Sequence, residues 1–180
     1  MTGKVLGCMP ERAHPLATLA VASLQCRAAL LTALNPSARL LIRGELHELP
    51  QPEPCRTIPA GDNVLLWLGP DEFLLVAPDE TMPALDISAA TIDISHRDAA
   101  LSVTGPRAAW VINAFCALDL HLAAFPVGTC TRTVFGKAEI LLWRTGAEEF
   151  RIDVARSFAP YVWACLEEAR REFLDGDGRL

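Results

Sequence analysis

Two stretches of the chain carry the same pattern of apolar and polar positions. Residues 65–76 read LLWLGPDEFLLV, and residues 141–154 read LLWRTGAEEFRIDV. In each stretch an apolar run ends at a turn that contains glycine, and a Glu-Phe pair opens a second apolar run. Apolar runs on both sides of turn-forming residues predict β-hairpins. We therefore predict two related halves, about 1–90 and 91–180, within a single domain spanning 1–180.

Further strands are expected on both sides of the first hairpin. The pattern predicts them at 39–43, 90–95, 101–103 and from 130 onward. Prolines at positions 50, 52, 54 and 59 leave the segment before the first hairpin without regular structure. Strands joined by hairpins are typical of antiparallel sheets, whereas a doubly wound parallel sheet needs long crossover connections.

Apolar positions recur with helical spacing in three segments. The first covers about 15–35, the second follows Gly105-Pro106 and ends near Leu118, and the third begins after Ser157 as its N-cap. The apolar stripe of the third helix is Phe158, Val162, Cys165, Ala169 and Phe173. A short helix is also expected within 79–86. The pattern thus predicts an α+β fold of antiparallel sheets with helices packed on one face.

Composition excludes several classes of protein. The chain of 180 residues is 51% hydrophobic and has a net charge of −6, with its basic residues scattered among acidic ones, which argues against nucleic-acid binding. Lys4 and Arg12 precede an apolar run that resembles a signal-peptide core, but the helical pattern continues past it. Gln25 and Arg27 interrupt any apolar stretch long enough to span a membrane.

The six cysteines stand apart, without a C-x-x-C pair or a histidine at the spacing of a metal site. Several of them fall within apolar helix or strand patterns. We therefore expect free, buried thiols and a cytoplasmic location.

Two sequence motifs suggest catalysis or cofactor binding but lack the arrangement that either would need. In DISHRD, a strand would point Asp93 and Ser95 to the face opposite His96, so these three letters do not make a proton relay. The VTGPRA segment at Gly105 is followed neither by further glycines at dinucleotide-binding spacing nor by a phosphate-binding lysine. The sequence thus predicts no catalytic, cofactor-binding or metal-binding residue.

One polar strand segment is a candidate for partner binding. Thr131, Arg132 and Thr133 are β-prone yet polar, and they follow a loop with Pro126 and Gly128 that favours a sheet edge or face. The partner interface predicted from the sequence comprises His96, Arg97, Thr131, Arg132, Thr133 and Lys137. A plain surface arginine at position 132 is the alternative.

The chain also resembles a known family. DISHRDAALSVTGPRAAWVINAF is similar to a segment of the aminomethyltransferase (glycine-cleavage T-protein) superfamily. CALDLHLAAFPVGTCTRTVFGKAEILLWRTG and FRIDVARSFAPYVWACLEEA resemble more closely the gamma subunit of heterotetrameric sarcosine oxidase, as do HPLATLA and LGPDEFLLV. The likeness covers nearly the whole chain and implies a two-part fold similar to the folate-binding T-protein fold.

The resemblance implies an accessory subunit without chemistry of its own. Its partners would be alpha, beta and delta subunits that hold FAD, FMN, NAD and tetrahydrofolate and oxidise sarcosine to glycine, with release of peroxide and capture of a one-carbon unit. Two alternatives remain: a stand-alone folate-binding one-carbon transfer protein, and a subunit of another N-methyl amine oxidase complex. The Lys-Gly-Cys-Tyr motif of a related tRNA-modification and iron–sulfur assembly factor has no counterpart around Cys130.

Overall fold

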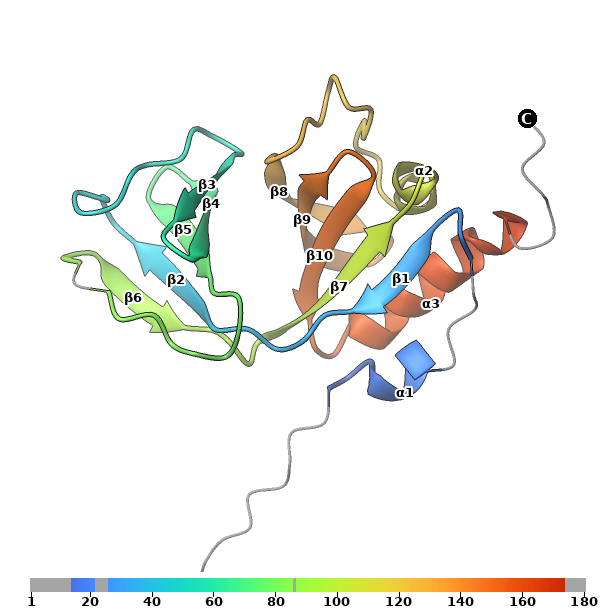
Figure 1. Cartoon of the computed structure of the whole chain (residues 1–180), viewed down its shortest axis with the longest axis horizontal. Coiled ribbons are helices and arrows are strands. Elements are labelled where there is room, and N and C mark those ends of the chain that lie inside the picture. Colours follow the sequence, from blue (N-terminus) through green and yellow to red (C-terminus); the bar gives the residue numbers. More distant parts are fainter. Residues whose placement is uncertain (1–13, 22–25, 86, 174–180) are drawn as a thin grey trace, which may run out of the picture.

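Two five-stranded antiparallel sheets meet at an angle in the computed structural model, which describes residues 14–21, 26–85 and 87–173 (Figure 1). The first sheet has the strand order β1 (Leu30–Ala33), β7 (Asp98–Thr104), β10 (Glu149–Ala155), β9 (Ala138–Gly146), β8 (Cys130–Phe135). The second has the order β3 (Thr57–Ala60), β4 (Asn63–Gly69), β5 (Glu72–Val76), β2 (Arg39–Arg43), β6 (Ala90–Asp93). With the helices described next, this architecture confirms the predicted α+β class.

Helices pack on one face of the first sheet, which we call the helix-covered sheet (Figure 1). They are α1 (Ala17–Val21), α2 (Ala108–Asn113) and α3 (Ala159–Ala169), followed by the 3₁₀ turn η1 (Arg171–Phe173). Alternate strand residues such as Leu101, Ile152 and Leu142 are fully buried against Trp163 and Leu166 of α3. Burying each such side chain contributes roughly 1.5–3 kcal/mol, so this cluster is the main core of the protein.

The second sheet, the loop-covered sheet, buries one face beneath two connecting segments instead of helices. Ile42, Leu65 and Phe73 are fully buried on that face. The side chains that cover them come from the segment that follows β2 and from the segment that precedes β6: Leu46, Leu49, Leu85, Ile87 and Ala89. The proline-rich segment after β2 is irregular through Pro54, as predicted, but still contributes apolar side chains to a core. At Pro59 the prediction is wrong, because this proline lies in strand β3 at the edge of the sheet, where a missing N–H is tolerated.

Both predicted hairpins are present. β4 pairs with β5 and β9 pairs with β10, and each hairpin closes on a glycine opposite a glutamate, Gly69 with Glu72 and Gly146 with Glu149. Each also carries a register shift of one residue next to that closing pair. Matching turns and matching Glu-Phe pairs explain why the two sequence stretches look alike.

The predicted long first helix is wrong. Helix α1 covers only Ala17–Val21, and residues 30–33 form strand β1, in which Leu31 lies opposite Val103. A short apolar run fits a helix and a buried strand equally well, and here pairing with β7 decides in favour of the strand. Residues 22–25 lie outside the described part of the chain.

Three smaller helix predictions also need correction. No helix forms within 79–85, where the Asp79 carboxylate accepts the Thr81 backbone N–H (2.7 Å) in a local turn, and residue 86 lies outside the described residues. Helix α2 ends at Asn113, whose side-chain amide donates to the Cys116 carbonyl (3.0 Å), well before Leu118.

Helix α3 begins one residue later than expected. Its N-cap is Phe158, 45% exposed, in place of Ser157, and no side chain caps it. The buried face consists of Ala159, Val162, Trp163 and Leu166. Of the predicted stripe, Val162 is fully buried, and Cys165, Ala169 and Phe173 are partly buried and pack against the same core, whereas Phe158 is exposed.

The chain passes between the sheets twice. Strand β1, from the first half, forms an edge of the helix-covered sheet by pairing with β7. The chain then builds the loop-covered sheet from β2 to β6 and returns through β7. The division into two repeated halves, about 1–90 and 91–180, stays a prediction. In the sequence, the strands of one sheet end with β6 at Asp93 and those of the other begin with β7, except that β1 belongs to the later sheet.

Candidate functional site

The two sheets meet in a junction whose apolar part is a small separate cluster. Leu66, Leu74 and Val76 of the loop-covered sheet pack against Cys130 of β8, with Trp143 at the margin. The backbone also crosses the junction, since the Cys130 N–H donates to the Cys55 carbonyl (2.9 Å). Burial raises the pKa of the Cys130 thiol to about 12, so it is an apolar packing group and not a nucleophile.

A buried ion pair joins the sheets beside this cluster. Arg39 of β2 contacts Asp153 of β10 at 2.8 Å, and their side chains are only 2% and 3% exposed. Arg151 contacts the other oxygen of Asp153 at 2.9 Å. Burial alone would raise the pKa of the Asp153 carboxyl, but the guanidiniums of Arg151 and Arg39 outweigh it and hold this pKa below its ordinary value. Asp153 is therefore a charged, fully buried link between the sheets.

A second ion pair lies nearer the surface of the junction. Glu72, at the start of β5, accepts two hydrogen bonds from Arg132 of β8, at 2.5 and 3.1 Å. Arg43 at the end of β2 approaches the same carboxylate at 3.2 Å. The hydrogen bonds from Arg132 lower the pKa of Glu72 despite its burial, and the charges of Arg132, Arg43 and Arg97 lower it further. Several guanidiniums thus converge on a single carboxylate.

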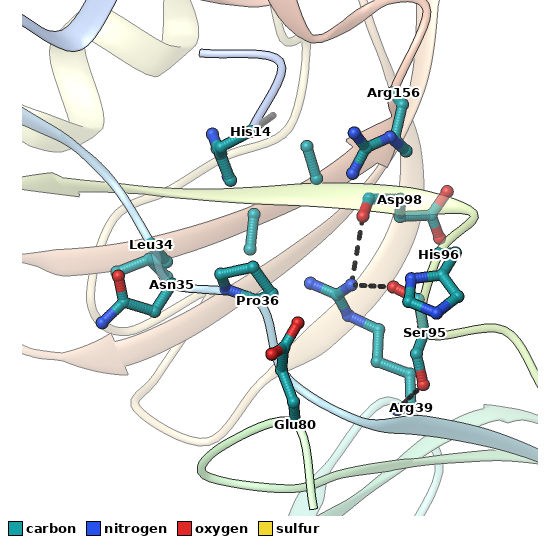
Figure 2. Close-up of a pocket in the computed structure, with 12 residues that line it drawn as sticks. His14, Leu34, Asn35, Pro36, Arg39, Glu80, Ser95, His96, Asp98 and Arg156 are labelled. Carbon is teal, nitrogen blue, oxygen red and sulfur yellow. Dashed lines mark hydrogen bonds between the residues drawn. The ribbon is translucent and has the colours of Figure 1, made fainter. Parts of the chain in front are cut away.

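Figure 2 shows the small cavity at the inner end of the junction. The Arg39 guanidinium donates to the carbonyls of Ser95 (3.3 Å) and Asp98 (3.1 Å), and His14 and His96 also line the cavity. Its volume is about 40 Å³. A water molecule needs about 10–15 Å³, whereas organic ligands occupy pockets of about 300 Å³ or more, so this cavity fits water molecules only.

A broader depression lies at the β1 edge of the helix-covered sheet. It measures about 850 Å³, is wide open to solvent, and is lined among others by Leu30, Thr104 and Glu149. Gly105 lies on its rim with φ +128°, and a Cβ there would meet the Ala28 carbonyl oxygen at 2.6 Å. Close approach of the backbone therefore explains this glycine without any phosphate-binding loop.

The structure places the predicted interface residues in three places. His96 and Arg97 are exposed in the turn between β6 and β7. Along β8, Arg132 faces the loop-covered sheet, whereas Thr131 and Thr133 alternate to the face that carries the helices. Lys137 lies in the β8–β9 turn, where its backbone N–H donates to the Tyr161 hydroxyl (3.2 Å). The structure therefore brings Arg97 and Arg132 near one carboxylate and keeps Lys137 apart.

The Ser-His-Asp letters do not form a relay. The Ser95 hydroxyl donates directly to the Asp93 carboxylate (2.6 Å) and accepts the Arg39 backbone N–H (2.9 Å), so His96 does not stand between the two. Bonds from the Ser95 hydroxyl and backbone lower the pKa of Asp93. This serine anchors strand β2 to the end of β6 and has no nucleophile geometry.

The described residues hold no metal cluster or disulfide. Within 14–21, 26–85 and 87–173, no group of three His, Cys, Asp or Glu side chains is placed to hold a metal ion. The described cysteines, at 26, 55, 116, 130 and 165, are free thiols; Cys8 lies outside the described residues. Over that same part of the chain, no helix is long and apolar enough to cross a membrane.

Sequence reasoning missed most of the charged residues of the junction, among them Arg39, Arg43, Glu72, Arg151 and Asp153. The signal in the sequence that could have identified them is a charged residue within an apolar strand pattern. Arg39 opens the run RLLIR, and Asp153 interrupts FRIDV. A charged residue inside an apolar strand pattern calls for a partner, because an unpaired buried charge is too costly.

Most of the chain matches one family of known proteins. A family model for the sarcosine oxidase, gamma subunit family matches residues 45–172. The chain belongs to this family. The match takes in the loop-covered sheet except for β2 and the helix-covered sheet except for β1.

Curated relatives agree. The sarcosine oxidase subunit gamma of Corynebacterium sp. (strain P-1) is 36% identical over 116 residues, which are 61% of this chain and 57% of that relative. The protein of the same name from Arthrobacter sp is 35% identical over 121 residues, 63% of this chain and 60% of the relative. The matched region thus spans less than two thirds of each relative's length.

Solved structures extend the likeness. A chain of the heterotetrameric sarcosine oxidase from Corynebacterium sp. U-96, in complex with pyrrole 2-carboxylate, has a TM-score of 0.80 and 30% identity, covering 93% of this chain and 99% of that one. The glycine cleavage system aminomethyltransferase T from Bartonella henselae has a TM-score of 0.61 at 16% identity, covering 78% and 46% respectively. The second likeness is one of fold alone, and it confirms the predicted T-protein-like architecture.

Proposed function

We propose that this chain is the small accessory subunit of a heterotetrameric sarcosine oxidase in the cytoplasm. The observation that carries the proposal is the match, over 93% of this chain and 99% of the other, to one chain of a heterotetrameric sarcosine oxidase. The partners are the alpha, beta and delta subunits. They bind FAD, FMN, NAD and tetrahydrofolate and oxidise sarcosine to glycine.

The chemistry of the described residues supports a role without catalysis. The buried carboxylate Asp153 is neutralised by arginines of the same chain, and the thiol of Cys130 is held protonated. A group that is fully paired inside its own fold has no free acid, base or nucleophile for a substrate. The junction between the sheets thus serves to hold the fold in one shape that partners recognise.

Co-expression tests this function. The chain, carrying an affinity tag, is produced together with the cognate alpha, beta and delta subunits, and the purified material is examined by size-exclusion chromatography and for sarcosine-dependent peroxide formation. We expect a stable complex with oxidase activity. Elution of the tagged chain alone, while the other subunits assemble and turn over without it, contradicts the proposal.

A stand-alone folate-binding protein is the second candidate, favoured by the fold likeness to aminomethyltransferase T. Among the described residues, the open depression at the β1 edge is large enough for such a ligand, whereas the cavity at the junction is too small. Isothermal titration of the isolated chain with tetrahydrofolate separates the two: the accessory-subunit proposal expects no binding. Replacing sarcosine by dimethylglycine in the activity assay distinguishes the third candidate, another N-methyl amine oxidase complex.

A further inference from the structure

Positive charge is concentrated where the two sheets meet. Five arginines of the junction, Arg39, Arg43, Arg97, Arg132 and Arg151, stand against four carboxylates, Glu72, Asp98, Glu139 and Asp153. This leaves an excess of one positive charge in a chain whose net charge is −6. The junction is thus opposite in sign to the protein as a whole.

The excess lies at the surface. Arg39 and Arg151 pair with the buried Asp153, and the two arginine side chains are only 2% and 14% exposed. The outer three, which we call the junction arginines, are Arg43, Arg97 and Arg132, and their side chains are 51%, 65% and 39% exposed. Their outer N–H groups therefore reach solvent.

Glu72 holds these side chains in place. Arg132 binds both of its oxygens and Arg43 binds one, so two guanidiniums that would repel each other are fixed side by side. Arg97 reaches toward Asp98 at 3.8 Å, which is too long for a strong bond and leaves its guanidinium available. A guanidinium fixed by one carboxylate can bind a second one bidentately at a small further cost in side-chain entropy.

An apolar neighbour completes the surface. Strand β8, which carries Arg132, is the outer strand of its sheet, and Val134 on the same face of that strand is 58% exposed. Interfaces combine such apolar contacts with charges that select the partner and its orientation. Nucleic acid is the weaker match, because a chain of net charge −6 repels a polyanion over its remaining surface.

From these contacts we infer that the junction arginines are the docking site for an acidic segment of a partner protein, whose carboxylates pair with Arg43, Arg97 and Arg132 while an apolar side chain covers Val134. This inference rests on the proposed function and adds to it where and by what chemistry the larger subunits bind. It keeps Arg97 and Arg132 of the interface predicted from the sequence, adds Arg43, and leaves Lys137 outside.

Charge reversal in the co-expressed complex tests the inference. Arg43→Glu and Arg97→Glu remove exposed positive charges, and the matched control is Arg171→Glu, a residue of η1 whose side chain is 64% exposed. We expect each junction variant to weaken association about tenfold or more, whereas the control stays within about twofold of wild type. Thermal melting of each isolated variant separates folding from binding.

Salt supplies the second readout. Association of the wild type should weaken as NaCl rises, and the Arg43→Glu/Arg97→Glu double variant should lose most of this dependence. Wild-type affinity and wild-type salt dependence in both junction variants overturn the inference while leaving the proposed function standing. Failure of the wild-type chain itself to join the complex overturns the proposed function instead. Binding of the wild-type chain to RNA, lost in the same variants, contradicts the choice of an acidic protein segment.

Discussion

Replacing Asp153 by asparagine removes the charge that compensates two arginines inside the junction. The side chain keeps nearly the same shape, so the change isolates electrostatics from packing. Arg39 and Arg151, 2% and 14% exposed, then face each other without a carboxylate between them. Breaking a buried pair by removing one partner costs about 3–5 kcal/mol, because the remaining charge stays buried.

The expected loss converts to a measurable shift. In a domain of this size 1 kcal/mol corresponds to about 2–4 °C in Tm, so Asp153→Asn should melt about 6–20 °C below the wild type. The assay is circular dichroism or differential scanning fluorimetry of the isolated chain at pH 7. The control is Glu168→Gln, which breaks an ion pair whose side chains are both 64% exposed and should change Tm by about 2 °C or less.

Acid pH should reproduce the effect in the wild-type protein. The pKa of Asp153 is lower in the folded chain than in the unfolded one, where it is about 3.9. Stability from this group is therefore complete above that unfolded value and is lost as pH falls through the folded pKa. Asp153→Asn should flatten the stability profile below about pH 4. A variant that melts within about 2 °C of the wild type at pH 7, with an unchanged acid profile, refutes the reasoning.

Four further predictions concern other properties of the molecule. Gly105→Ala should lower the free energy of unfolding in urea by about 1–3 kcal/mol or more, because its Cβ would meet the Ala28 carbonyl oxygen at 2.6 Å. The control Gly61→Ala, also at positive φ but in open space, should lower it clearly less, and equal losses would remove the steric explanation. In the native chain at pH 8, the Cys130 thiol should react with a thiol reagent far more slowly than after denaturation, because burial raises its pKa to about 12; equal rates contradict its burial. Non-reducing mass analysis should find all six cysteines reduced, and a stable disulfide would contradict the proposed cytoplasmic location. The purified isolated chain should be colourless, and a stoichiometric flavin spectrum would remove the main support for an accessory role.

Local patterns in the sequence were sufficient for the hairpins. The Leu-Leu-Trp run, the glycine and the Glu-Phe pair define each hairpin within about a dozen neighbouring residues, so turn chemistry and alternation decide the structure. The helices were harder, because residues 30–33 fit two periods and only the distant strand β7 selects between them. The buried face of α3 likewise includes Trp163, which packs in the main core and was not part of the predicted stripe.

The junction could not be predicted by the same means. Arg39 and Asp153 contact each other from opposite ends of the chain, and Glu72 and Arg132 do so from different sheets. Nothing in the neighbourhood of either residue identifies its partner. Arg97 and Arg132 were predicted for a different reason, as polar residues on β-prone segments, and the structure adds the carboxylate that brings them together.

The position of β1 has a consequence for how the protein reaches its fold. During synthesis, residues 30–33 leave the ribosome long before their partner β7, at residues 98–104, has been made. The loop-covered sheet, built from contiguous residues, can form first, while β1 waits as an unpaired strand with apolar side chains. The helix-covered sheet then closes with a long loop, a slow step in folding. A nascent chain that ends at residue 96 should therefore contain a folded loop-covered sheet. The apolar segment 30–33 that precedes this sheet is then still unpaired and available to chaperones.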